Sequence, residues 1–101
     1  MKESLTLFSK KELADIHSLS RGYNGSGDKP HAEVLLRLMA KHIEEVSQRY
    51  REKDEHYVVE AGDLVVLCFE LMLEAGYEPD EIMIECYNRY RKKFTSLLEK
   101  E

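Results

Sequence analysis

The amino-acid sequence predicts an all-α chain of four helices, and three observations carry that prediction. Glycine and proline are scarce, with five and two among 101 residues. Apolar residues recur at helical spacing through most of the chain, and short polar stretches separate these segments. The content of 43% hydrophobic and 35% charged residues suits a soluble helical protein. The length suits a single domain spanning residues 1–101.

The first helix has a clear start signal. Ser9 and Glu12 form a capping box, in which each side chain can satisfy a backbone N–H of the other residue. Leu13, Ile16 and Leu19 follow at helical spacing, and Gly22 is the predicted end. The glycine-rich segment 22–30 is predicted to be a loop. It is either a mobile segment that closes over a ligand or a plain connector.

The second helix is predicted from about residue 31 to about residue 51. Its apolar stripe consists of Leu35, Met39, His42, Ile43 and Val46. We expect His42 to be a packed or hydrogen-bonded residue of the core rather than a ligand. The other three histidines, His17, His31 and His56, are expected on the surface or in loops. The polar residues 51–56 are predicted to form the turn into the third helix.

The third helix, from about residue 57 to about residue 75, is apolar around most of its circumference. Such a helix is usually central in a bundle or an oligomer. Gly76 is a suitable residue to end it. Pro79 opens the fourth helix, followed by acidic residues at the positive end of the helix dipole. The apolar stripe of this helix consists of Ile82, Met83, Cys86, Tyr90, Phe94 and Leu97.

The second and third helices are predicted to form a central antiparallel hairpin that bends near Asp54. In that register Glu45 is level with Asp63, and Gln48 is level with Glu60. Crowded carboxylates raise each other's pKa values unless a cation neutralises them. Mg²⁺ prefers such oxygen ligands and commonly bridges to phosphates. The spacing therefore predicts a Mg²⁺ site near the turn of the hairpin.

A second interpretation of the same acids remains open. Glu60, Asp63, Glu70 and Glu74 follow one line along the third helix. That line is also what the solvated face of a surface helix would look like.

Charge and hydropathy exclude some classes of protein. The net charge of −5 disfavours a protein that binds a nucleic acid polymer. The longest apolar run, 64–69, is far shorter than the roughly 20 residues of a membrane-spanning helix. The N-terminus has no apolar region typical of a signal peptide. Cys68 and Cys86 lie in apolar helical patterns, so we expect buried free thiols and a cytoplasmic location.

The chain from about His31 to Phe94 resembles the MazG-like, all-α nucleoside triphosphate pyrophosphohydrolase superfamily. The resemblance rests on E-E-V-S-Q at 44–48 and E-A-G-D at 60–63, where the family has E-E-x-x-E and then E-x-x-D. The turn G-Y-E-P-D-E at 76–81 and N-R-Y-R at 88–91 are also similar. Gln48 departs from the family pattern, because its amide offers a neutral oxygen where the family has a carboxylate.

This resemblance implies an Mg²⁺-dependent enzyme that converts nucleoside triphosphates to monophosphates and pyrophosphate, in nucleotide-pool housecleaning. It also implies a homodimer or homotetramer, assembled as a helical bundle. The implied Mg²⁺ ligands are Glu45, Gln48, Glu60 and Asp63. The implied general bases are Glu44 and Glu45, and the implied substrate-binding residues are Asn88, Arg91 and Lys92.

Two alternatives stay open beside this hypothesis. Because of Gln48, the chain could be a catalytically weakened or inactive nucleotide-binding or regulatory oligomer. It could also be a structural helical module that binds no ligand. The basic residues 89–93 are likewise compatible with a solvated helix end that favours cations.

Overall fold

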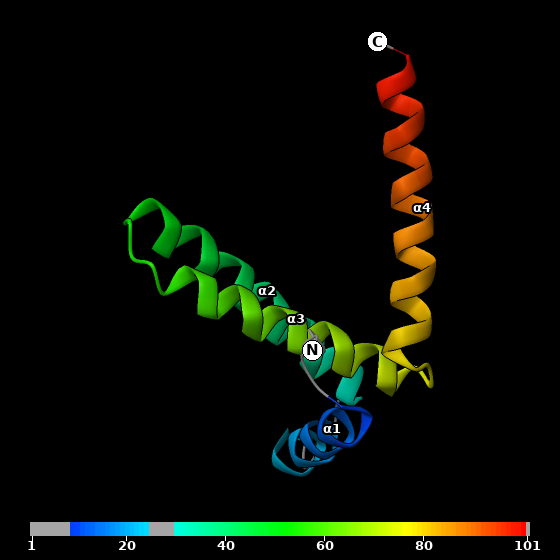
Figure 1. Ribbon diagram of the computed structural model, residues 1–101. Coiled ribbons are helices and arrows are strands. Elements are labelled where there is room, and N and C mark those ends of the chain that lie inside the picture. The colour runs from blue at the N-terminus through cyan, green and yellow to red at the C-terminus, as the bar shows by residue number, and fades with distance from the viewer. Residues whose placement is uncertain (1–8, 25–29, 101) are drawn as a thin grey trace, which may run out of the picture.

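The computed structural model describes residues 9–24 and 30–100. This part of the chain contains four helices and no strand, which confirms the all-α prediction. The helices are α1 (Lys10–Asn24), α2 (His31–Arg51), α3 (Tyr57–Glu74) and α4 (Pro79–Glu99) (Figure 1). Most of the predicted loop 22–30 lies outside the described residues. None of the four helices is long and apolar enough to cross a membrane.

The capping box at the start of α1 is confirmed. The backbone N–H of Ser9 donates to Oε1 of Glu12 at 3.0 Å, and the N–H of Glu12 donates to Oγ of Ser9 at 3.1 Å. The predicted end at Gly22 is wrong by two residues, because the helix continues to Asn24. Glycine tolerates helical dihedral angles, and the amide of Asn24 donates to Oγ of Ser20 one turn earlier at 3.3 Å.

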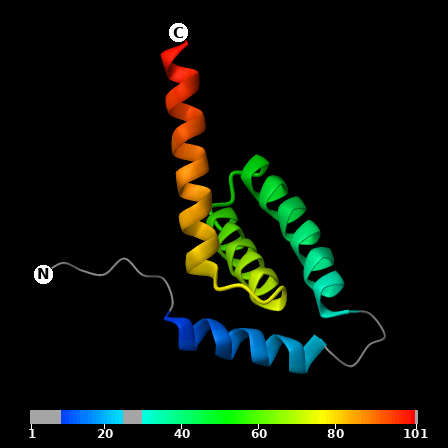
Figure 2. The ribbon, with the colours of Figure 1, turned by 90° about the vertical axis from the view of Figure 1, so that its right-hand side faces the viewer.

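Helices α2 and α3 form the predicted antiparallel hairpin. They lie side by side in both ribbon views and share the most extensive interface among the four described helices (Figures 1 and 2). Leu35 of α2 is fully buried, and Leu67 of α3 is buried. Helix α1, which contributes the buried Leu13, contacts both α2 and α3 and lies across the end of the hairpin opposite its turn (Figure 2).

The turn of the hairpin is closed by backbone hydrogen bonds at the end of α2. The N–H of Asp54 donates to the carbonyl of Arg49 at 2.9 Å, and the N–H of Lys53 donates to that of Tyr50 at 3.1 Å. This is a Schellman pattern, which requires a left-handed residue after the helix. Lys53 takes that conformation, with φ 61°. The rings of Tyr50 and Tyr57 stack edge to face across the turn, with centroids 5.3 Å apart.

The same pattern ends α3, where Gly76 has φ 91° as the sequence predicts. The N–H of Tyr77 donates to the carbonyl of Met72 at 3.0 Å. Helix α4 then leaves in a new direction and contacts only α3 among the described helices (Figure 1). The position of α4 is therefore set near its first turns, and no other described helix packs along its remaining length.

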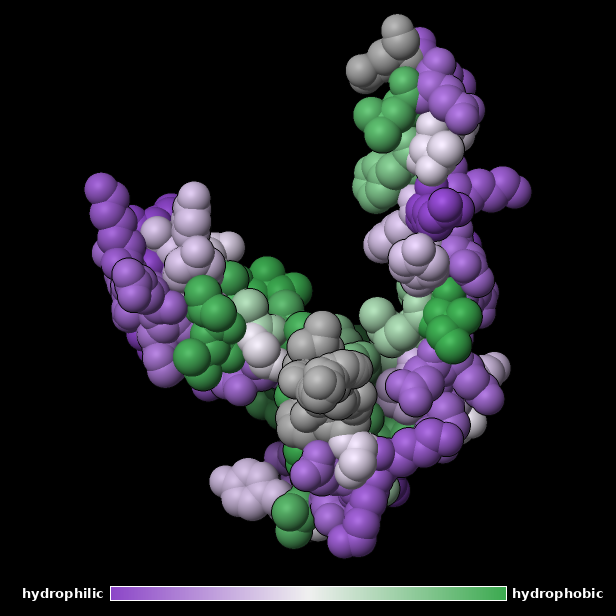
Figure 3. Space-filling model, in the orientation of Figure 1, coloured by the Kyte–Doolittle hydropathy of each residue, from purple (hydrophilic) through white to green (hydrophobic). Residues whose placement is uncertain are grey.

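Much of the apolar surface of α4 is exposed to solvent. Figure 3 shows green side chains on the upper part of this helix, mainly on the side that faces the open space between α4 and the hairpin. The exposed apolar residues of α4 are Met83, Ile84, Tyr87, Tyr90, Phe94, Leu97 and Leu98. Val58, Val59 and Val65 of α3 are exposed as well. Within the part of the chain that the structure describes, apolar faces of two helices are thus exposed.

Candidate metal centre

Three side chains of the hairpin converge near its turn. Nε2 of His42 on α2 lies 3.6 Å from Oε1 of Glu60 and 3.8 Å from Oδ2 of Asp63, both on α3. One donor atom from each of the three residues lies within 4.8 Å of the others. The side chain of Glu60 is 13% exposed and that of Asp63 is 56% exposed. The group is therefore anchored inside the hairpin and open to solvent on the side of Asp63.

A hydrogen bond on the other side of the His42 ring determines which ring nitrogen carries the proton when the ring is neutral. Nδ1 of His42 lies 3.0 Å from the carbonyl oxygen of Leu38, one turn earlier in α2. A carbonyl only accepts, so Nδ1 carries the proton and donates it. In the neutral ring Nε2 then presents its lone pair to the two carboxylates. Metal-binding histidines typically hold their second nitrogen in this way.

Arg49 also reaches into the acidic group. Its Nε lies 3.6 Å from Oε2 of Glu60, and its Nη1 donates to Oδ2 of Asp54 at 2.8 Å. The backbone N–H of His56 donates to Oδ1 of Asp54 at 2.9 Å. That bond, together with the Arg49 guanidinium, lowers the pKa of Asp54. Arg49 therefore compensates the charge of Glu60 while joining the end of α2 to the turn.

The other two predicted ligands, Glu45 and Gln48, lie next to this group on α2. Together with Arg49 and Glu52 they line a shallow hollow. The amide of Gln48 donates to Oε2 of Glu52 at 3.0 Å, along its own helix. Glu45 follows His42 by three residues and so shares its face of the helix. The structure brings Glu60 and Asp63 together with His42, whereas Glu45 is not a member of that group and the Gln48 amide is turned to Glu52.

Glu44, the other predicted base, is exposed. Adjacent residues of a helix point about 100° apart, so Glu44 and Glu45 cannot share one face. Of the two, Glu45 is the residue on the side of His42.

The acids of α3 are not the solvated face of a surface helix. Glu70 is 4% exposed, and the side chains of Glu60 and Glu74 are 13% and 19% exposed. Only Asp63 of the four is largely open to solvent. The line of acids is turned inward, toward α2 and α1, which contradicts that interpretation.

The expected positions of two histidines are also wrong. His17 is largely covered and His31 is buried, whereas His56 is exposed as expected. The cause is the docking of α1 across the hairpin, which covers both side chains and which no local pattern in the sequence reveals.

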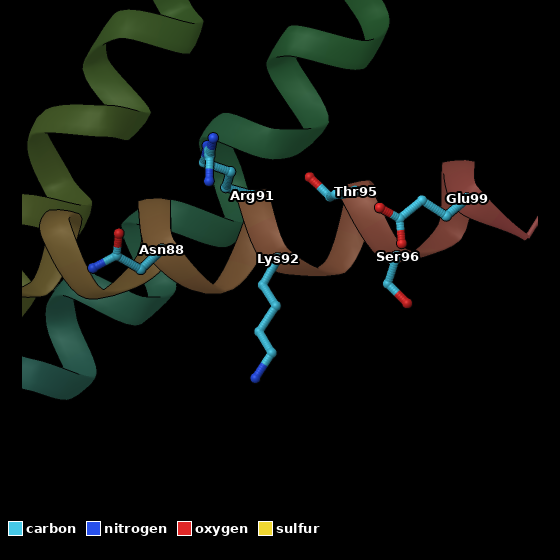
Figure 4. A pocket seen from close by; sticks show the side chains of 6 residues that line it. All are labelled: Asn88, Arg91, Lys92, Thr95, Ser96 and Glu99. Carbon is cyan, nitrogen blue, oxygen red and sulfur yellow. The ribbon is translucent and has the colours of Figure 1, made fainter.

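The predicted substrate-binding residues lie on α4. Asn88, Arg91 and Lys92 line an open hollow on this helix with Thr95, Ser96 and Glu99 (Figure 4). Arg91 and Lys92 extend to opposite sides of the helix rather than toward one point (Figure 4). Because α4 contacts only α3 and diverges from the hairpin, one chain does not bring these residues to the acids near the turn (Figure 1).

Comparison with known proteins gives no match to a family model, to a curated protein or to a solved structure. The chemistry of the site must therefore be judged from its donors. Two carboxylates and an imidazole nitrogen form a donor set for a divalent cation.

Proposed function

We propose that the chain is an Mg²⁺-dependent nucleotide pyrophosphohydrolase that converts nucleoside triphosphates to monophosphates and pyrophosphate. The observation that carries the proposal is the group formed by His42, Glu60 and Asp63 on the two arms of the hairpin. One covered carboxylate and one exposed carboxylate that converge on an imidazole nitrogen from the facing helix are a setting for a cation, because the two like charges repel each other. The resemblance of residues 44–48 and 60–63 to the MazG-like motif supplies the substrate class.

In the proposed site, Glu60 and Asp63 hold the cation, and Glu45 and Gln48 complete its oxygen ligands. The bound cation supplies positive charge for the phosphates and a more acidic water molecule. Glu45, with Glu44 as the second candidate, accepts the proton of the water that attacks the α-phosphorus. The α–β phosphoanhydride bond breaks, and pyrophosphate leaves. Asn88, Arg91 and Lys92 offset the charge of the phosphates.

The proposal includes a homodimer or homotetramer, because one chain holds only part of the site. The acids lie on the hairpin, whereas the basic residues lie on a helix that projects away from it. The exposed apolar side of α4 and the exposed valines of α3 support burial against a second copy. In such an assembly α4 of one copy supplies its basic residues to the hairpin of another.

The test is release of pyrophosphate from a panel of nucleoside triphosphates, with and without Mg²⁺. Asp63→Asn should reduce turnover by more than about tenfold, since it removes a charged ligand. Gln48→Glu should raise turnover at limiting Mg²⁺, because it restores the fourth carboxylate. Glu85→Gln, which neutralises an exposed glutamate of α4, is the matched control and should leave turnover unchanged. Equal turnover in Asp63→Asn and the wild type would contradict the proposed site.

A second candidate function is a nucleotide-binding or regulatory oligomer without turnover. Two contacts favour it: Arg49 already compensates Glu60, and the Gln48 amide is engaged with Glu52. Nucleotide binding with no pyrophosphate release, for every nucleotide in the panel, would select this function. A structural module without a ligand would instead show a melting temperature that neither Mg²⁺ nor any nucleotide changes.

A further inference from the structure

A second group of metal-binding side chains lies at the opposite end of the hairpin, where α1 crosses it. Nε2 of His17 on α1 lies 2.8 Å from Oε1 of Glu74 on α3. The ring of His31, the first residue of α2, has its centroid 5.9 Å from that of His17. One donor atom from each of these three residues lies within 4.8 Å of the others. Three helices thus each contribute one donor to this point.

His31 is the member of this group whose hydrogen-bonding capacity is least satisfied among the described residues. It is 7% exposed, and its buried Nδ1 has no hydrogen-bond partner among the described residues. Its Nε2 has only a long contact of 3.5 Å with Oγ of Ser20. A buried polar atom without a partner costs about 1–3 kcal/mol. Neither nitrogen of this ring is firmly engaged, although the ring is held in place by burial.

Glu74 is arranged to present one oxygen to the histidines. Its other oxygen, Oε2, accepts from the guanidinium of Arg21. This contact lowers the pKa of Glu74, with a smaller contribution from His17. The carboxylate is therefore charged at neutral pH, and it is oriented by a contact to the oxygen that does not face His17. Metal-binding carboxylates are commonly held in this way by a neighbouring donor.

We propose that His17, His31 and Glu74 form a binding site for Zn²⁺, separate from the Mg²⁺ site proposed near the turn. Two imidazole nitrogens and one carboxylate are a donor set that Zn²⁺ accepts, with a water molecule in the fourth position. Mg²⁺ disfavours such a set because it prefers oxygen ligands. Tetrahedral Zn²⁺ with bonds of about 2.0 Å needs donors about 3.3 Å apart. The three donor atoms lie within 4.8 Å of one another, so the wider separations must shorten by up to about 1.5 Å when the ion binds.

The proposed ion joins α1 to the hairpin. Helix α1 has far fewer contacts with α2 and α3 than these two have with each other. A ligand that binds only the folded, docked arrangement stabilises it in proportion to its affinity. Zn²⁺ should therefore raise the melting temperature and slow amide exchange in residues 10–24.

The test is a titration of the chelator-treated full-length protein with Zn²⁺, and with Co²⁺ as a spectroscopic probe. The wild type should bind with a rise in melting temperature and give the visible absorption of tetrahedral Co²⁺. His17→Gln keeps an amide that can donate to Glu74, so the fold should persist, as circular dichroism can check. It should lose more than about 100-fold in Zn²⁺ affinity, beyond what removal of an outer contact costs. His31→Gln should behave in the same way.

The matched control is His42→Gln, which removes the imidazole of the group near the turn. It should leave the Zn²⁺ affinity of the α1 site and its Co²⁺ absorption unchanged. Wild-type affinity in His17→Gln, or a loss of binding confined to His42→Gln, would overturn the proposal. Pyrophosphate release is a separate measurement, and His17→Gln should leave it at the wild-type level in Mg²⁺. The two proposed sites can therefore fail independently.

Discussion

At the scale of single residues, the hairpin turn contains a lysine in a conformation that lysine disfavours. Lys53 has φ 61°, and the left-handed region costs a residue with a β-carbon about 1–2 kcal/mol. The turn still forms because Asp54 accepts from both Arg49 and the backbone of His56. Glycine occupies the equivalent position at the end of α3 without that cost.

We expect Lys53→Gly to raise the free energy of unfolding by about 1 kcal/mol, because glycine adopts the left-handed conformation without strain. Lys53→Ala is the control, since it removes the same exposed side chain and keeps the β-carbon. Urea denaturation monitored by circular dichroism measures both. Equal stability of the two variants would show that the backbone conformation is not the source of the effect.

Glu74 gives a prediction for the response to acid. Its pKa is lowered by the hydrogen bond from Arg21 and also by His17, relative to an ordinary value of 4.5. A carboxylate with a lowered pKa in the folded state stabilises the fold above its unfolded pKa, and this stabilisation is lost as pH falls through the folded pKa. In the presence of a chelator, the wild type should therefore melt above Glu74→Gln at pH 7. The difference should shrink between about pH 5 and pH 3.

The control for this measurement is Glu85→Gln, which neutralises an exposed glutamate of α4. Its melting temperature should follow that of the wild type throughout the acid range. A constant difference between the wild type and Glu74→Gln across the range would refute a role for the charged form of Glu74.

At the scale of helices, local patterns predict the elements but not how they dock. The capping box of Ser9, the turn near Asp54 and the glycine end of α3 depend on residues a few positions apart, and all three are confirmed. The burial of His17 and His31 depends on where α1 crosses the hairpin, a long-range contact that no periodicity encodes. His42 was placed on the apolar stripe of α2, and its ring nitrogen nevertheless faces Glu60. The predicted register places His42 level with residue 66 rather than with Glu60, so this contact depends on the reach of the two side chains along the hairpin and not on the register.

Helix α4 gives a prediction about protection of its backbone. Helices stabilised only by their own hydrogen bonds are marginal in water, and of the other helices in the described residues α4 contacts only α3. In dilute protein we expect amides beyond Asn88 to exchange rapidly, while those at the centre of α2 and α3 stay protected. Raising the protein concentration should slow exchange in α4 if a second copy covers it. Mass spectrometry of peptic peptides resolves the two regions, and protection of α4 that is independent of concentration would contradict an intermolecular cover.

At the scale of the whole molecule, the chain has a small core for its length. Only Leu13, Leu35 and Leu67 are buried among the hydrophobic residues of the described part. A chain of about this size buries a modest fraction of its surface alone, and association is a common way to bury more. The exposed apolar residues of α3 and α4 are the surfaces that association would cover.

We expect substitution on the apolar side of α4 to weaken self-association. Phe94→Glu places a charge in the stripe where Phe94 packs near Tyr90, with ring centroids 6.0 Å apart. The dissociation constant of the oligomer should rise more than tenfold, which corresponds to a loss of more than about 1.4 kcal/mol in the free energy of association. Ser96→Asp adds the same charge to the polar side and should change it little. Sedimentation velocity over a range of concentrations measures both, and a monomeric wild type would contradict the proposed homo-oligomer.

The junction between α3 and α4 has a mechanical consequence. Helix α4 has 21 residues and so a length of about 30 Å. Among the described helices it contacts only α3, so a rotation of about 10° at its base would move the distal end by about 5 Å. Small adjustments of the backbone around Gly76 thus become large displacements of the basic side chains farther along. The final position of those basic side chains would therefore be set by the molecule against which α4 packs.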